Sequence, residues 1–438
     1  MGERVVVTGV GAVSALGNDA RTQWNALLRG VSGVARLREL AEDLELRADC
    51  DRPLAAARVR GIDPGDWITD RKAARAMRLH THLAFAATGQ AMTSAKIHPG
   101  NIDADATGIT LGVTMIDYDI ADLELAARRS LHDPTGFDIE RFCRTGWRAI
   151  SPMVSIVMLN NATLCQIAMQ YRLHGPNASF SPFGEAGGQA IGAALRMLQE
   201  GDAEVMLAGG VSPRLNLSAL QRMLYLGIVA RTTDPAAGSC RPFDRDRTGT
   251  VPGEGAAVLV LETLTHARAR GAHVLAEVLG HGAAVGAPPG PEPHPPHAAI
   301  EQSLAAALDD AGLTPDQLGC VYADAPGLRS GDAVEAAAIG AVLGRHAPGI
   351  PVTSAKGATG HLLAAALPLH SVFAVHGLVE RRVPAIANLR YAEPDSGLAL
   401  VCGGARRMGA GTAVACLAGG FRGQSECVVF GAFEAKGA

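Results

Sequence analysis

Short apolar runs alternate with longer segments of helical periodicity along most of the chain. The runs with the length and branching of buried strands are residues 5–8, 108–113, 256–261, 319–323, 413–417 and 427–430. Ala-rich and apolar segments with the character of buried helices occupy residues 82–95, 189–198, 298–311 and 362–367. This alternation predicts an α/β fold, with the last two strands paired to one another.

The order of these elements is the same in the two halves of the chain. Helix 82–95 leads through His98-Pro99-Gly100 to strand 108–113, and helix 298–311 leads through residues 312–315 to strand 319–323. Each half then reaches a turn of small residues that opens a buried helix, at 181–188 and at 354–361. The repetition predicts two related halves, with boundaries 1–270 and 271–438 and a Pro-rich loop at 287–296.

Composition and charge exclude several classes of protein. Hydrophobic residues make up 48% of the 438 positions and charged residues 19%, which favours a large core over disorder. The net charge of -4 argues against nucleic-acid binding. We find no run of about 18 uninterrupted apolar residues and no signal-peptide core, so we expect no membrane span and a cytoplasmic location.

Candidate metal, thiol and nucleotide sites are weak. The eight cysteines show no metal spacing and predict mostly buried, reduced thiols, Cys165 among them as a core residue. His294 and His297 lie in the Pro-rich loop, where solvated histidines are favoured over a metal pair. Residues 9–14, Gly-Val-Gly-Ala-Val-Ser, lack the third glycine of a dinucleotide fingerprint and indicate a tight turn. We therefore expect no metal and no cofactor.

Six short motifs stand in an order typical of one enzyme family. They are Arg4-Val5-Val6-Val7-Thr8-Gly9-Val10-Gly11, Gly175-Pro176-Asn177, Arg241-Pro242-Phe243-Asp244, Gly253-Glu254-Gly255-Ala256, Gly360-His361-Leu362-Leu363 and Gly420-Phe421-Arg422-Gly423. On these motifs nearly the whole chain resembles the β-ketoacyl synthases of the thiolase superfamily. The resemblance implies a thiolase-like fold, in which two related βαβαβαββ halves form a five-layered α-β-α-β-α sandwich.

The chemistry of that family depends on residues that this chain has largely lost. In the family, a Cys at the N-terminus of a buried helix takes an acyl group from an acyl carrier protein. Two His residues, with a Lys and an acidic residue, support decarboxylation of the malonyl unit. A gapless count places Gly184 at the nucleophile position, and a one-residue gap would place Glu185 there. The first His position holds Asp324, while His361 and Lys356 remain, so no catalytic set is intact.

One branch of the family fits a kept scaffold with a lost nucleophile. This is the chain length factor, or ketosynthase β-subunit, of type II polyketide synthases. The resemblance implies a heterodimer with a Cys-bearing ketosynthase that elongates a polyketide from malonyl-acyl carrier protein, with this chain shaping the tunnel and inactive alone. Residues 185–188, Glu-Ala-Gly-Gly, match the Gln-Ala-Gly-Gly of aromatic-polyketide members except for the Glu. A partner from a reducing, polyene-type synthase is equally compatible.

Other interpretations of the same residues stay open. Glu185 in the first turn of a helix is also what the helix dipole favours, and Asp324 could pair with Lys356 and neutralise it. The chain could instead be a decarboxylase or unusual acyltransferase that works through His361, Lys356 and Glu185. It could also be a homodimeric, non-enzymatic scaffold that holds carrier proteins or lipids.

The resemblance also implies which residues line the substrate tunnel. The segment after strand 108–113 corresponds to the one that plugs the tunnel end in chain length factors. Its candidates are Met115, Ile116, Tyr118, Ala121 and Leu125, to which the resemblance adds Phe421. Residues 118, 121 and 125 have helical spacing and would share one face. An ordinary apolar helix face in a dimer core would show the same pattern.

The small residue in this segment provides a direct test of the tunnel assignment. In a reconstituted pair, Ala121→Phe should shorten the products, because added bulk removes volume and overpacking costs about 1–3 kcal/mol. Mass spectrometry of the released chains would measure the change. Unchanged product length would remove Ala121 from the tunnel.

Overall fold

The structure is a computed structural model. It describes residues 2–37, 54–114, 120–133, 136–152, 154, 159–213, 215–288, 290, 293–393 and 396–434. Eleven strands form one mixed sheet, in the order β14-β12-β11-β16-β17-β10-β1-β9-β8-β4-β7. The α/β class predicted from the alternation of strands and helices is confirmed.

The first half of the chain builds one side of this sheet. Its strands are β1 (Val5–Ser14), β4 (Thr107–Val113), β7 (Asn177–Phe180), β8 (Val205–Val211) and β9 (Gly255–Thr263). The helices that connect them are α5 (Leu79–Ala95), α9 (Ala162–Tyr171) and α10 (Ala186–Glu200). Strands β7, β4 and β8 are parallel, whereas β9 is antiparallel to both β8 and β1.

The second half repeats this arrangement element by element. Its strands are β10 (Ala276–Val285), β11 (Leu318–Tyr322), β12 (Pro351–Thr353), β16 (Ala413–Gly419) and β17 (Gln424–Gly431), and its helices are α13 (His297–Ala311), α14 (Arg329–Leu343) and α16 (Ala366–Glu380). Strands β12, β11 and β16 are parallel, and β17 is antiparallel to β16 and β10. Each half is therefore a βαβαβαββ unit with the same strand order, as the repeat predicted.

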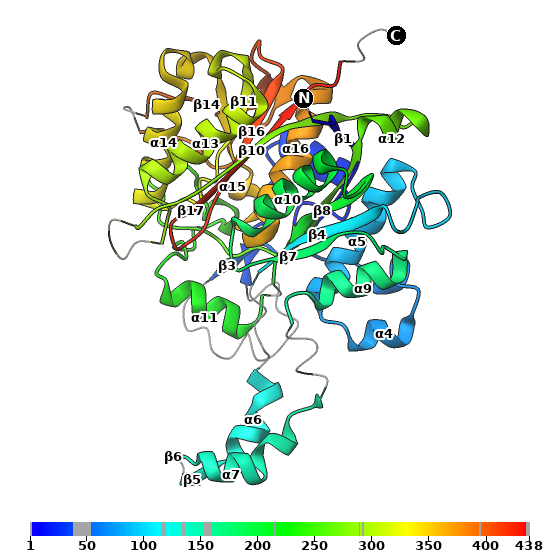
Figure 1. Ribbon diagram of the computed structural model, residues 1–438. Coiled ribbons are helices and arrows are strands. Elements are labelled where there is room, and N and C mark those ends of the chain that lie inside the picture. The colour runs from blue at the N-terminus through cyan, green and yellow to red at the C-terminus, as the bar shows by residue number, and fades with distance from the viewer. Residues whose placement is uncertain are drawn as a thin grey trace.

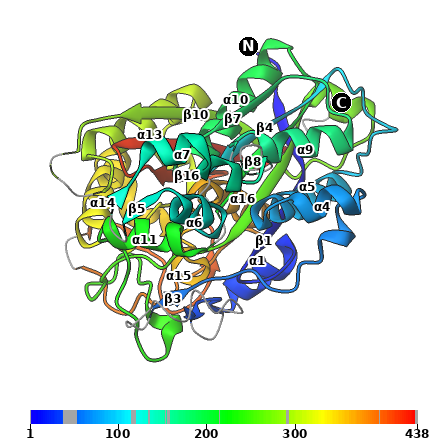
Figure 2. The same cartoon turned by 90° about the horizontal axis from the view of Figure 1, so that it is seen from below.

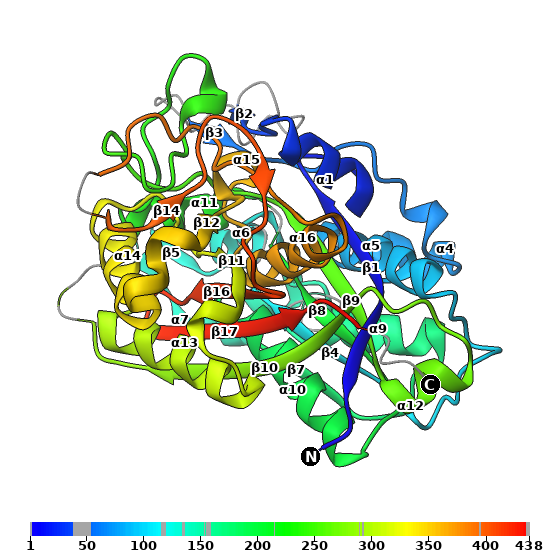
Figure 3. The same cartoon turned by 90° about the horizontal axis from the view of Figure 1, so that it is seen from above.

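The two units join at their first strands, where β1 pairs antiparallel with β10. Helices α13 and α14 cover one outer flank and α5 the opposite one, while α10 and α16 lie between the two sheet halves (Figures 1 and 3). The result is the five-layered, thiolase-like arrangement. Its centre is a continuous apolar core in which α16 residues such as Leu367 and Phe373 are completely buried.

The glycine motif of residues 9–14 allows close packing. It neither forms a turn nor binds phosphate. Gly9 and Gly11 lie within β1, not in a loop, so the predicted tight turn is wrong. A Cβ on Gly11 would come within 2.0 Å of the Ala87 carbonyl oxygen, and one on Gly9 within 2.3 Å of that of Ala91. These glycines let helix α5 lie directly on the strand.

Most predicted helices and strands are confirmed, although their first and last residues differ from the prediction. The exception is the predicted helix 362–367. The turn at 354–361 contains the short helix α15 (Lys356–Thr359), and the long buried helix α16 begins only at Ala366. The predicted helix 362–367 therefore covers only the entrance to α16. One apolar helical stretch, Leu363–Glu380, has the length and composition of a membrane span, but 83% of it is buried inside the protein.

An arm that contains residues 120–133 and 136–150 projects from the body of the molecule in Figure 1 and lies in front of the body when the molecule is seen from below (Figure 2). It contains α6 (Ile120–Arg129), α7 (Ile139–Arg144) and a short hairpin of β5 (Leu131–Asp133) and β6 (Gly136–Phe137). The remaining named elements are α1 (Ala20–Leu28), α4 (Arg71–Ala76), α11 (Leu217–Tyr225), α12 (Leu264–Ala269), β2 (Ala35–Arg36), β3 (Ala55–Ala56), β13 (Arg382–Val383), β14 (Ala399–Leu400) and β15 (Arg406–Arg407).

Candidate functional site

Four segments from both halves of the chain converge at the centre of the molecule. They are the N-terminus of α10, the loop after β11, helix α15 with the residues that follow it, and the loop between β16 and β17. Together they bring Gly184, Glu185, Asp324, Lys356 and His361 into one buried site. The candidate site residues that lie far apart in the sequence are thus neighbours in the fold.

Gly184 lies beside the surviving imidazole. A Cβ on Gly184 would point toward His361, 3.7 Å from Cε1 of the ring. The same Cβ would meet the carbonyl oxygen of Gly419 at 2.5 Å, which is shorter than any real contact of this kind. Gly419, the last residue of β16 before the β16–β17 loop, therefore blocks the place where a larger side chain at position 184 would begin.

Glu185 is buried on the other side of that loop. A Cβ on Gly420 would lie 2.5 Å from Oε2 of Glu185, so the loop passes closely over the carboxyl group. Oε2 has no hydrogen-bond partner among the described residues. Burial, above all, raises the pKa of Glu185 to about 7, and the carboxylates of Glu426 and Asp324 add to the rise. Glu185 thus has much of its population protonated near neutral pH.

Asp324 and Lys356 form a buried ion pair, the pairing that the sequence left open. The ammonium group of Lys356 donates to Oδ1 of Asp324, and both side chains are almost completely shielded from solvent. The backbone beneath the pair is held by Glu335, whose two oxygens accept the N–H groups of Asp324 and Ala325, each at 2.7 Å. Burial raises the pKa of Glu335 to about 8, with the charge of Asp324 as a second cause.

His361 is a neutral donor. Its Nδ1 accepts the backbone N–H of Leu363 at 3.1 Å. Burial and the nearby charge of Lys356 hold the pKa of His361 well below its usual range, so the single ring proton resides on Nε2. Nε2 is buried without a partner among the described residues. The ring edge also packs on Phe421, with 5.7 Å between centroids.

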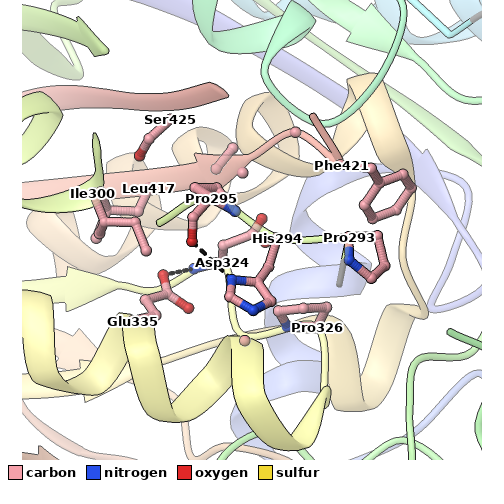
Figure 4. Close-up of a pocket in the computed structure, with 14 residues that line it drawn as sticks. Pro293, His294, Pro295, Ile300, Asp324, Pro326, Glu335, Leu417, Phe421 and Ser425 are labelled. Carbon is pink, nitrogen blue, oxygen red and sulfur yellow. Dashed lines mark hydrogen bonds between the residues drawn. The ribbon is translucent and has the colours of Figure 1, made fainter. Parts of the chain in front are cut away.

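Two pockets flank this centre and share Phe421. The one we call the Asp324 pocket encloses about 400 Å³ of empty space, part of it open to solvent, and is lined by Pro293, His294, Pro295, Ile300, Asp324, Pro326, Gly331, Glu335, Leu417, Ala418, Gly419, Gly420, Phe421 and Ser425. The His361 pocket encloses about 410 Å³, again including open solvent, and is lined by Thr114, Phe183, Pro213, Leu215, Ala219, Arg222, Met223, Leu226, Gly253, His361, Leu363 and Phe421. Figure 4 shows Glu335, Asp324 and His294 next to one another, between Ile300 and Leu417 on one side and Phe421 on the other.

No cysteine among the described residues lines either pocket. Cys240 lies behind the site, with Sγ 3.9 Å from the carbonyl oxygen of Pro326. Burial raises the pKa of Cys240 to about 12, so it is a thiol and not a nucleophilic thiolate. Cys165 is exposed on α9, which corrects its assignment to the core, because it falls on the outer face of that helix.

The predicted tunnel residues divide into three groups. Met115, Ile116 and Tyr118 lie outside the described residues. Ala121 belongs to α6 in the arm, and Leu125 on the same helix is 49% exposed on this chain. Phe421 is buried between the two pockets.

The two loop histidines differ from one another. His294 is buried, and its Nδ1 donates to the carbonyl oxygen of Pro295 at 2.8 Å, so the solvated-loop interpretation is wrong for it. The Pro-rich loop folds onto the Asp324 pocket and takes the ring out of solvent. His297 begins α13 and pairs with Glu301 at 3.4 Å. No group of three or more His, Cys, Asp or Glu residues could hold a metal ion in the part of the chain that the structure describes.

Three further polar residues belong to the site, although the sequence did not single them out for it. Glu335 supports the backbone of Asp324, and Glu426 faces Glu185 from β17 while pairing with His281 of β10. A Glu directly before the apolar run 427–430 was a possible signal, because buried carboxylates in strands need partners. The partners of Glu426 depend on tertiary contacts between β17, β10 and α10.

The comparisons with known proteins agree on one family. Models of the β-ketoacyl synthase N-terminal and C-terminal domains match residues 2–267 and 275–390. A 3-oxoacyl-[acyl-carrier-protein] synthase 2 of Synechocystis sp. is 31% identical over 413 residues, covering 93% of this chain and 92% of that protein. The protein of the same name from Vibrio cholerae is 32% identical over 428 residues and 98% of each chain.

Two solved structures have nearly the same fold over 99% of this chain and all of theirs. A ketosynthase/chain length factor for ishigamide superposes with a TM-score of 0.85 at 26% identity. A chain from a type II polyketide synthase complex, an acyl-carrier protein with its ketosynthase bound to the hexaketide, gives a TM-score of 0.84 at 25% identity.

The buried carboxyl of Glu185 predicts a pH-dependent stability. Its folded pKa of about 7 exceeds its value of roughly 4.3 in an unfolded chain. Between these values the native state binds more protons than the unfolded state, so the free energy of unfolding falls as pH rises. The free energy of unfolding of Glu185→Gln should therefore rise relative to that of the wild type, by up to about 3 kcal/mol, as the pH goes from 4.5 to 8.

Urea denaturation across this pH range would measure the difference. The matched control is Glu200→Gln, at the exposed C-terminal end of the same helix, which should follow the wild type at every pH. A constant difference between Glu185→Gln and the wild type from pH 4.5 to 8 would contradict the assignment of a shifted carboxyl at Glu185.

Proposed function

The chain belongs to the β-ketoacyl synthase family, and on that premise we propose that it is the chain length factor of a type II polyketide synthase. In this role it pairs with a Cys-bearing ketosynthase. The partner takes the acyl group and condenses it with malonyl units delivered by an acyl carrier protein. This chain provides the interface and part of the cavity that holds the growing product.

The observation that carries the proposal is the state of the nucleophile position. Gly184 has no side chain, and the carbonyl oxygen of Gly419 lies where a Cβ would begin. Asp324 stands where the family has its first His and is tied to Lys356. Without a thiolate the chain has no group for reversible acyl transfer, a loss on the order of 10⁴-fold or more in rate. Condensation therefore requires a second polypeptide that brings the sulfur.

The surface of the chain supports pairing with another large subunit. The projecting arm exposes Leu125, Phe137, Ile139 and Trp147, each about half exposed or more. Strand β7 ends the sheet, and its outer edge pairs with no strand among the described residues. Exposed apolar side chains and unpaired strand edges promote aggregation of a monomer. A permanent interface with another subunit would cover them. We expect the interface to exceed about 2,000 Å² in total, as obligate pairs do.

The neighbours in fold support the same assignment. One of the similar structures is a ketosynthase/chain length factor, and another combines a ketosynthase with its acyl-carrier protein. The curated relatives are 3-oxoacyl-[acyl-carrier-protein] synthases, which favours a carrier-bound substrate for the pair. We propose the acyl carrier protein as a transient partner on these grounds.

Co-expression with type II ketosynthases, followed by size-exclusion chromatography with light scattering, tests the pairing. We expect a 1:1 heterodimer with one of them, and a radiolabelled acyl-carrier substrate should label only the ketosynthase. Ile139→Asp in the arm should weaken the pair at least tenfold, because the interface would bury an unpaired charge.

The control for the arm is Val379→Asp, which alters a similarly exposed residue at the end of α16 and should leave the pair intact. A stable homodimer without affinity for any ketosynthase would favour the scaffold alternative. Covalent uptake of the label by this chain alone would overturn the proposal.

One observation favours a second candidate function, decarboxylation of malonyl-acyl carrier protein at this chain's own site. The Nε2–H of His361 is a buried donor without a partner among the described residues, and the residue lines the His361 pocket. Such a donor can stabilise the oxygen of a thioester carbonyl as it becomes an enolate, while CO₂ leaves. This reaction needs no thiol.

The candidate is tested by CO₂ release from carboxyl-labelled malonyl-acyl carrier protein. The purified chain should release label, and His361→Ala should abolish the release. His297→Ala changes a histidine outside both pockets and should have no effect. If the wild-type chain releases no CO₂, only the non-catalytic role remains.

A further inference from the structure

A third pocket lies apart from the candidate site and is larger than either pocket beside it. It encloses about 810 Å³ of empty space, part of it open to solvent, whereas the Asp324 pocket encloses about 400 Å³. Its walls are the end of β1 with the loop that follows, residues 32–35 at the start of β2, and the segment after β3 that contains Arg60. We call it the Arg60 pocket. None of the candidate site residues lines it.

The charged side chains that line the Arg60 pocket, among the described residues, are two arginines. Arg58 has its charge compensated from the interior, because its Nε lies 3.5 Å from Oε2 of the buried Glu254. Arg60 is exposed and forms no ion pair within the described part of the chain. Asp19, which follows the loop after β1, is engaged elsewhere, since its carboxylate accepts the N–H of Thr22 at 2.7 Å. The guanidinium of Arg60 is therefore an uncompensated positive charge at the pocket.

Backbone donors without acceptors line the same pocket. The N–H groups of Ala15, Asn18 and Ser32 donate to no group in the part of the chain that the structure describes. In contrast, the carbonyl oxygens of Gly17, Asn18 and Arg60 already accept hydrogen bonds. The pocket thus presents free backbone donors beside a positive charge, a combination that favours an anion.

The number and placement of the donors favour a phosphate group over a carboxylate. A phosphomonoester has three strongly accepting terminal oxygens and nearly two negative charges at neutral pH, whereas a carboxylate has two oxygens and one charge. The donors come from three separate segments of the chain, so a tetrahedral anion can satisfy more of them than a planar one. The pocket is larger than a phosphate ion, and the side chains of Leu16 and Val34 also line it. This remaining space suits the organic part of an ester.

We propose that the Arg60 pocket binds a small molecule through its phosphomonoester group. Arg60 provides the positive charge, and the backbone N–H groups of Ala15, Asn18 and Ser32 provide hydrogen bonds to the phosphate oxygens. The site is separate from Gly184 and His361, so it depends on neither of the two functions proposed above.

One wall of the Arg60 pocket is bonded directly to the helix that carries Lys356. Oγ of Ser32 donates to the carbonyl oxygen of Gly357 at 3.3 Å, and the N–H of Gly33 donates to that of Ala358 at 2.9 Å. Both acceptors belong to α15. A ligand held by Ser32 therefore stabilises the loop that supports α15, and local opening of this helix becomes rarer when the pocket is filled.

Isothermal titration calorimetry of the full-length protein at low ionic strength tests the site, with phenyl phosphate as the probe. We expect one site per chain with a Kd of roughly 1 mM or tighter. Benzoate, which has the same ring and a carboxylate, should bind at least tenfold more weakly. Inorganic phosphate should also bind more weakly, because it leaves the apolar part of the pocket empty.

Arg60→Gln should weaken the binding of phenyl phosphate at least tenfold, because it removes the uncompensated charge from an exposed position. The matched control is Arg29→Gln, which changes an exposed arginine at the C-terminal end of α1, outside the pocket. This variant should bind phenyl phosphate as tightly as the wild type.

Amide NMR spectra of the deuterated protein locate the bound probe. Phenyl phosphate should shift the amide protons of Ala15, Asn18 and Ser32 downfield, as new hydrogen bonds to an anion do. Hydrogen exchange in the segment 354–361, measured by mass spectrometry, should slow at least threefold.

The proposal is overturned if phenyl phosphate does not bind, if Arg60→Gln binds it as tightly as the wild type, or if the shifted amides lie outside the pocket. Inorganic phosphate that binds as tightly as phenyl phosphate would overturn the ester and assign the free ion in its place. Binding without slower exchange in the segment 354–361 would overturn the link to α15.

Discussion

A buried positive charge governs the centre of this molecule. Lys356 lies on a short helix in the core, where an unpaired ammonium group would cost several kcal/mol. Asp324 provides the compensating charge, and Glu335 fixes the backbone that carries it through two hydrogen bonds of 2.7 Å. The position that the family resemblance aligns with a His is thereby part of an ion pair.

The frame around this pair is that of the whole family. Two halves with the same strand order join where β1 pairs with β10, and helices α10 and α16 fill the space between the two halves of the sheet. Glycines such as Gly11 in β1 allow helices to lie directly on the sheet, which fixes the distances between layers. The same close packing keeps both pockets and Phe421 in place.

Several buried polar side chains lie around Gly184, where the described residues include no thiol. Within the part of the chain that the structure describes, Glu185 and His361 each have a buried atom without a hydrogen-bond partner, one beneath the β16–β17 loop and one at a pocket. A hydrogen-bonded pair, Glu426 and His281, packs against the glycines of α10, the helix that follows Glu185. In a site that served only as filler, apolar side chains would cost less than these groups, since buried polar atoms lose hydration.

The sequence by itself determined the fold class and the duplication, which follow from periodicity and repeated order and are local properties of the chain. The resemblance to β-ketoacyl synthases added the expectation of a lost nucleophile, since no Cys lies between positions 165 and 240, and of Asp324, Lys356 and His361 as one set of site residues. Only the tertiary structure decided that Gly419 closes the space beside Gly184, that His294 is buried, and that Glu426 and His281 stand on the glycines of α10. Those facts depend on how closely segments from different halves approach one another, and the order of residues along a chain does not encode such distances locally.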